Sequence, residues 1–116
     1  MLTGDDKTLV IEMVEGDWGE ILPLEIISDE EFTTADSFVI EIFKDITSIE
    51  PIITKKYSNI QGKSIDFSIT EEESNRLKIG TYFYNIDWYK ENSLLSNIVC
   101  SKMFKVINKA GKKIWK

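Results

Sequence analysis

The chain has 116 residues and a net charge of −6, and 42% of its residues are apolar and 29% are charged. This length and balance suit one domain with a single modest core, and they exclude the highly charged, apolar-poor profile of a disordered chain. Affinity for a phosphate backbone depends largely on Lys and Arg, so the acidic composition excludes nucleic acid from the expected partners.

Basic and acidic residues are unevenly distributed along the chain. Residues 1–91 hold all twenty acidic residues and eight basic ones, whereas residues 92–116 hold six lysines and no acid. Such a separation of charge can steer identical copies head to tail, although a solvated basic tail without a partner is the simpler interpretation. We expect a single domain over residues 1–107 and a basic C-terminal tail over residues 108–116.

The N-terminal residues MLTGDDKTLVIEM lack the charged start and long apolar run of a secretory signal. No apolar run in the sequence approaches the roughly 18 residues of a membrane helix. We therefore expect a soluble protein without a membrane partner.

Apolar residues recur at every second position through most of the chain, and β-branched and aromatic residues fill these runs, which predicts half-buried strands. Pro23 lies within one run and cannot donate to a strand ladder, so an edge strand or a bulge is expected there. Seven short strands separated by turn signals are typical of an all-β, antiparallel β-sandwich. The predicted strands cover residues 8–14, 20–27, 37–44, 52–57, 63–69, 81–90 and 94–107.

The sequence GDWG connects the first two predicted strands. Gly16 and Gly19 permit the positive φ values of a tight connection, and Asp17 can cap the turn through its own side chain. Trp18 is expected to cover the open end of the core with its indole. We assign these four residues a structural role, with ligand contact by Trp18 as the alternative.

The next connection, residues 28–36, is acidic. Its carboxylates are the hard oxygen ligands that Ca²⁺ prefers, but the segment lacks the alternating Asp or Asn spacing and the Gly of a defined calcium loop. A solvated acidic loop is the favoured interpretation, and we expect no metal and no cofactor.

Residues 70–80 break the alternation and predict a short helical crossover. Thr70 and Glu73 have the spacing of a capping box, Leu77 supplies an apolar contact, and Gly80 is expected to end the turn as a left-handed cap. In immunoglobulin-like sandwiches, a Tyr that follows such a crossover folds its hydroxyl back onto upstream backbone. Tyr82 is the candidate for this corner, with an exposed ligand-contacting tyrosine as the alternative.

The last predicted strand has an apolar set at even positions: Ile98, Cys100, Phe104 and Val106 are expected to point inward, and only Lys102 interrupts them. A bulge near Lys102 would explain the interruption. Cys100 on the inward face would behave as a small hydrophobic residue.

Aromatic residues predict an interaction surface. Phe83 and Tyr89 lie on the outward side of one strand, and Phe43 and Val39 lie on the second face of another. If these strands are neighbours, they form an apolar patch that a monomer does not ordinarily leave open. We expect an assembly contact there, extended by Trp115 of the tail. A carbohydrate platform and a patch covered by loops or by the tail are the alternatives.

The sequence contains no histidine, which excludes Ser-His-Asp and Cys-His nucleophiles and any His-ligated metal. A glycosidase would need a carboxylate held in an apolar pocket, and the predicted inward faces carry no acid apart from Glu25. We therefore expect no enzymatic activity.

Together these motifs resemble the immunoglobulin-like β-sandwich domains of bacteriophage tail and baseplate proteins, which upper baseplate proteins of phages of Gram-positive bacteria carry at the N-terminus. The resemblance spans roughly residues 8–107. Its motifs are the Gly-Asp-x-Gly turn, the strand ILPLEI, the segment IDFSIT, the pattern LxxGxYxYNI from Leu77 to Ile86, and the closing strand FKV.

This resemblance implies a virion structural or adaptor role, with other tail or baseplate proteins or further copies of the chain as partners. It implies location in the virion, or in the host cytoplasm before assembly. The Lys- and Ile-rich composition is typical of AT-rich genomes and fits a low-GC Gram-positive host. A small carbohydrate-binding or cell-wall-binding module, with a glycan as partner, is the alternative.

Overall fold

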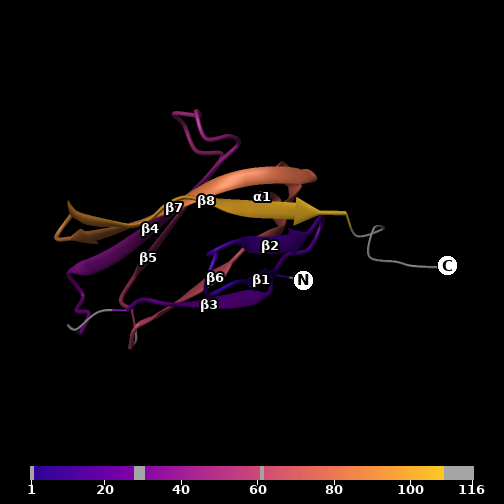
Figure 1. Ribbon diagram of the computed structural model, residues 1–116. Coiled ribbons are helices and arrows are strands. Elements are labelled where there is room, and N and C mark those ends of the chain that lie inside the picture. Colours follow the sequence, from indigo (N-terminus) through magenta and orange to yellow (C-terminus); the bar gives the residue numbers. More distant parts are fainter. Residues whose placement is uncertain (1, 28–30, 61, 109–116) are drawn as a thin grey trace.

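The computed structural model describes residues 2–27, 31–60 and 62–108. In this part of the chain, strands form a mixed six-stranded sheet and a two-stranded antiparallel sheet, joined by one short helix, α1 (Glu71–Arg76) (Figure 1). The strands are β1 (Leu2–Gly4), β2 (Ile11–Val14), β3 (Ile21–Glu25), β4 (Asp36–Phe43), β5 (Ile53–Ser58), β6 (Ser64–Ser68), β7 (Gly80–Lys90) and β8 (Ser93–Ile107). All seven predicted strands are confirmed.

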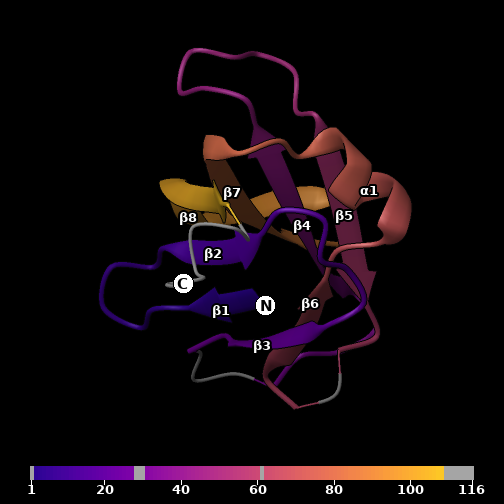
Figure 2. The same cartoon turned by 90° about the vertical axis from the view of Figure 1, so that its right-hand side faces the viewer.

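The larger sheet has the order β1-β2-β8-β7-β4-β5, and the smaller one pairs β3 with β6. The larger sheet curls, so that its edge strand β1 lies between β2 and β3 (Figure 2). The prediction of purely antiparallel pairing is wrong at β2 and β8, which run parallel. These two strands lie far apart in the sequence, so no hairpin fixes their relative direction.

The N-terminal strand β1 was not predicted. It forms a hairpin with β2 through a turn in which the Asp5 carboxylate accepts hydrogen bonds from the backbone N–H groups of Lys7 and Thr8. Three residues are too short a run for an alternating pattern to be visible in the sequence.

The core fills the space between the two sheets. Side chains of β4 and β7 on the inner face meet those of β6, and Phe67 packs edge-to-face against Phe104 of β8 with ring centroids 6.3 Å apart. The inward positions of β4 and β7 match the predicted alternation. Fully buried side chains include Phe38, Ile40, Ile42, Ile65, Phe67, Leu77 and Phe104.

The short helix begins with the predicted capping box. Thr70 Oγ1 accepts from the Glu73 N–H at 3.2 Å, and Glu73 Oε1 accepts from the Thr70 N–H at 2.9 Å. The predicted cap at Gly80 is wrong, because Leu77 caps the helix in an extended conformation and redirects the chain at once. Gly80 has a φ of 152° but is the first residue of β7.

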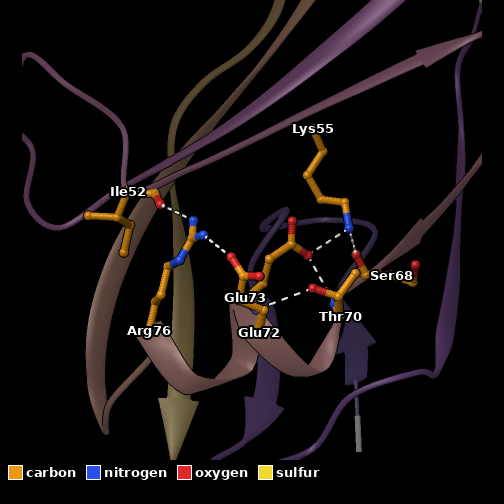
Figure 3. Close-up of polar contacts among 7 residues, drawn as sticks. All are labelled: Ile52, Lys55, Ser68, Thr70, Glu72, Glu73 and Arg76. Atoms are coloured by element: carbon orange, nitrogen blue, oxygen red, sulfur yellow. Dashed lines mark hydrogen bonds and ion pairs between the residues drawn. The ribbon is translucent and has the colours of Figure 1, made fainter.

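A polar network on this side ties the two sheets together (Figure 3). Lys55 of β5 donates from its ammonium group to the Ser68 carbonyl of β6 and to Glu73 Oε1, the latter at 2.8 Å. Arg76 donates to the Ile52 carbonyl and pairs with Glu72. The crossover therefore fixes β5, the edge of the larger sheet, to β6 of the smaller one.

The Tyr82 hydroxyl folds back onto upstream backbone as the sequence predicts. It accepts from the Lys78 N–H at 2.9 Å and donates to the Lys78 carbonyl at 3.0 Å. The pair of hydrogen bonds anchors the start of β7 to the end of the crossover.

The long strand β8 contains extra residues relative to β7. Between the pairs Tyr84↔Lys102 and Ile86↔Val99, β8 advances three residues while β7 advances two, and Ser101 takes a φ of 53°. This confirms the predicted bulge near Lys102. The predicted inward position of Cys100 is wrong, because the extra residue changes the face and leaves the thiol exposed. Phe104 and Val106, beyond the bulge, are buried as predicted.

Phe67→Ala should lower the free energy of unfolding by about 3–5 kcal/mol, because it empties a fully buried position and removes the contact with Phe104. Denaturant melts measure this change. Ile49→Ala, at a loop position that is 92% exposed, is the control and should stay within about 0.5 kcal/mol of wild type. A neutral Phe67→Ala variant would mean that β6 does not face the core.

Loss of the sheet-to-sheet network should also destabilise the fold. Lys55→Met should cost about 1–3 kcal/mol, because it leaves the largely buried Glu73 carboxylate and the Ser68 carbonyl without their donor. Thermal or denaturant melts at pH 7 measure the cost. Lys56→Met, on the opposite face of the same strand and exposed, is the matched control and should be nearly neutral.

The same network predicts a pH dependence. Burial alone would raise the pKa of Glu73, but Lys55 and the hydrogen bonds with Thr70 hold it below its ordinary value of 4.5. A lowered carboxylate pKa contributes stability that is present above about pH 4.5 and is lost as the pH falls through the folded-state pKa. Glu73→Gln should therefore make the acid limb of a stability-against-pH curve shallower than in wild type, and an unchanged limb would contradict this.

Candidate interaction surface

The outward face of the six-stranded sheet carries apolar side chains side by side on three neighbouring strands. Phe43 of β4 is directly opposite Phe83 of β7, and Phe83 is opposite Met103 of β8. Phe43 and Phe83 are half-buried, and Met103 is 36% exposed. We call these three residues the phenylalanine row. The sequence predicted Phe43 and Phe83 as parts of one surface, and the register places them in contact range.

Two acidic residues lie beside the phenylalanine row on the same face. Glu41 is two residues from Phe43 on β4, and Asp87 is two residues along β7 from Asn85, the partner of Glu41. Burial raises the pKa of Glu41, and the negative charge of Asp87 raises it further. The Asn97 side chain donates to Asp87 Oδ1. In the free protein this face therefore holds two carboxylates that repel each other.

The structure does not bring all residues of the predicted interaction surface together. Tyr89 is opposite Ser37 of β4 and Leu94 of β8, six residues along β7 from Phe83, which corresponds to about 20 Å in an extended strand. Tyr89 therefore does not belong to the phenylalanine row. Trp115 lies outside the described residues.

The GDWG turn has the predicted backbone conformation. Gly16 and Gly19 have φ values of 88° and 87°, where a side chain would be strained. The Asp17 N–H donates to the Val14 carbonyl, and the Gly19 N–H donates to the Ile69 carbonyl, which fixes the turn to the end of the core. Trp18 lines a small hollow there but is 55% exposed. Its indole covers the core end only in part.

Sequence reasoning missed a buried acid. Asp36 is 1% exposed, and its carboxylate accepts from the Thr33 N–H at 2.8 Å and from the Trp88 indole N–H at 2.9 Å. Burial alone would raise the pKa of Asp36, but these hydrogen bonds and the charge of Lys90 hold it below its ordinary value. The carboxylate thus anchors the ring cluster of Phe32, Phe38 and Trp88. The feature of the sequence that could have indicated this buried acid is the Thr33-x-x-Asp36 spacing.

No helix in the described part of the chain has the length and apolar character needed to cross a bilayer. Within residues 2–27, 31–60 and 62–108, no three cysteine or acidic side chains gather into a metal-binding group. No protein-family model matches the chain, and no curated protein or solved structure matches it significantly. The physical character of the outward face is therefore the basis on which a function is proposed.

Removal of the Glu41 charge should stabilise the protein at neutral pH. A carboxyl whose pKa is raised in the fold contributes stability below its ordinary pKa of 4.5, and this contribution is lost as the pH rises through the folded-state value. Glu41→Gln should therefore be more stable than wild type at pH 7, and the difference should shrink at pH 4. Denaturant melts at both pH values measure this, with the exposed Glu50→Gln as the control for removal of a charge elsewhere.

Proposed function

We propose that the chain is an immunoglobulin-like β-sandwich that serves as a non-enzymatic structural or adaptor domain of a phage tail or baseplate. It acts through protein–protein contacts, and the phenylalanine row is the centre of its interface. The observation that carries this proposal is the register of Phe43, Phe83 and Met103, three large apolar side chains placed side by side on the outward face of a sheet.

Three features of the strands support the immunoglobulin-like assignment. The last strand, β8, lies between β7 and the N-terminal strand β2, with which it runs parallel. The strands β3 and β6 form the opposite layer. The crossover between β6 and β7 carries the tyrosine corner at Tyr82.

The chemistry of the outward face indicates which partner surface it fits. An apolar row bordered by Glu41 and Asp87 is complementary to a surface with large apolar side chains and a neighbouring Lys or Arg. A cation placed there would relieve the repulsion between the two carboxylates. Apolar centres of this kind hold most of the binding free energy in known interfaces, while polar borders set specificity.

The test is co-assembly with the proteins encoded by the neighbouring genes, which the proposal expects to be tail or baseplate genes. Wild-type protein should form a complex whose mass is measured by light scattering after size-exclusion chromatography. Phe43→Lys combined with Phe83→Lys should weaken the complex at least about tenfold, since it places charge at the apolar centre. Ile49→Lys, on an exposed loop, is the control and should bind as wild type.

A thermal melt of the double variant establishes that it is folded. A strictly monomeric wild-type protein that binds none of the neighbouring gene products would contradict the proposal. Binding of cell-wall sugars that changes Trp fluorescence, and that the double variant loses, would replace it with the glycan-binding alternative.

A further inference from the structure

A cleft opens on the flank of the molecule, opposite the polar network of α1. It lies between the β1–β2 hairpin, β3 and the inner face of β7 and β8, and its volume is about 530 Å³. Its walls are mainly apolar and include Leu22, Leu24, Ile86, Ile98 and Val99. The Tyr84 hydroxyl in the lining donates to the Leu9 carbonyl, so this polar group is already satisfied. The cleft is therefore suited to apolar side chains.

Two strands that contribute to the cleft have edges without a strand partner. Among the described residues, β3 pairs only with β6. In the described part of the chain, β8 is paired on its β2 side only from Phe104 to Ile107, so the stretch Ser93–Met103 has β7 as its one strand neighbour there. Free strand edges offer N–H and C=O groups to an added extended segment, and the apolar groove beside them offers room for its side chains.

The lining of the cleft also carries negative charge. It includes Asp5, Asp6 and Glu25, all exposed, and neither Asp6 nor Glu25 makes an ion pair with a described residue. An occupant with both apolar side chains and lysines would match this combination of an apolar wall and an acidic border.

We propose that the cleft binds residues 109–116 of a second copy of the chain as an added extended segment. This segment, KAGKKIWK, contains four lysines together with Ile114 and Trp115, and it lies outside the described residues. Ile114 and Trp115 occupy the apolar cleft, and the lysines face Asp6 and Glu25. The proposal uses a surface different from the phenylalanine row and holds whether or not the protein belongs to a phage tail.

The geometry of β8 favours a second copy over the same chain. Strand β8 runs from Ile98, in the cleft wall, to Ile107, which pairs with Val14. Figure 1 shows that β8 ends on the side of the molecule away from the β7–β8 hairpin. Ile98 and Ile107 are nine residues apart, about 30 Å in an extended strand. From Asn108 to Trp115 the chain spans at most about 25 Å and must first reverse direction. The segment of the same chain therefore does not reach Ile98, whereas this limit of length does not apply to the segment of a neighbour.

Such a contact is heterologous, because the cleft of one copy takes the segment of the next. Repetition of the contact builds a ring or an open head-to-tail chain of subunits. Wild-type protein should accordingly show a mass that increases with concentration in analytical ultracentrifugation.

Two variants test the proposal, and each of them lacks one half of the contact. The first reverses the charge of the cleft border with Asp6→Lys and Glu25→Lys, both at exposed positions. The second ends at Asn108. Each variant alone should be monomeric, and an equimolar mixture should form a 1:1 heterodimer, because the first supplies a segment and the second supplies a cleft. The control, Glu50→Lys with Glu71→Lys, reverses the same number of exposed charges away from the cleft and should associate as wild type.

Methyl NMR locates the contact. A synthetic peptide of residues 109–116, added to the variant that ends at Asn108, should shift the Ile98 and Val99 methyl signals and leave those of Val39, on the outward face of β4, unchanged. A wild-type protein that stays monomeric at all concentrations would overturn the proposal, as would a mixture that stays monomeric or a peptide that leaves Ile98 and Val99 unshifted. A shortened variant that melts at a lower temperature than wild type, with both proteins monomeric, would do the same, because it would indicate docking within one chain.

The outcome is separable from that of the proposed function. The Phe43→Lys and Phe83→Lys variant should retain this self-association, because the phenylalanine row lies on the outward face. Loss of binding to tail proteins with intact self-association, or the reverse, shows which of the two interfaces exists.

Discussion

The fold depends on contact between two layers of unequal size. Six strands present their inner face to only two, and the chain, with a single cysteine, has no intrachain disulfide to reinforce the contact. Stability therefore rests on large apolar side chains from β4, β7 and β8 that meet Ile65 and Phe67 of β6. These residues also fix which face of each long strand turns outward, and so they place Phe43 and Phe83 on the surface.

The unequal layers give the molecule two different flanks. On one flank, α1 covers the gap between the sheets, and Lys55 and Glu73 fill it with a hydrogen-bonded ion pair. On the other flank, the curled sheet brings β1 near β3 without backbone pairing between them in the described residues, and the cleft results. The contacts on the closed flank fix the two sheets relative to each other. The other flank can therefore remain open without loss of the core.

Much of this fold is predictable from the sequence, because burial on one face of a strand imposes a period of two. That period gives the seven longer strands and the inward sets of β4, β6 and β7, while the capping box follows from the spacing of Thr70 and Glu73. It does not give the direction of β2 relative to β8, since partners such as Ile11 and Phe104 are more than ninety residues apart in the sequence. It also fails for Cys100, because a bulge at Ser101 shifts the face, and Ser carries no signal for the positive φ that the bulge requires. The contact of Phe43 with Phe83 follows from the alternation only once the register is known.

The parallel pairing of β2 with β8 has a mechanical consequence. The chain enters β2 at Ile11 and leaves β8 at Ile107, at opposite ends of the paired segment, which joins Ile11–Val14 to Phe104–Ile107. Tension between the two ends of the polypeptide, after β1 has peeled away, pulls these strands along their length in opposite directions. The backbone bonds of the segment then share the load together instead of breaking one after another, which makes this short patch the force-bearing part of the domain.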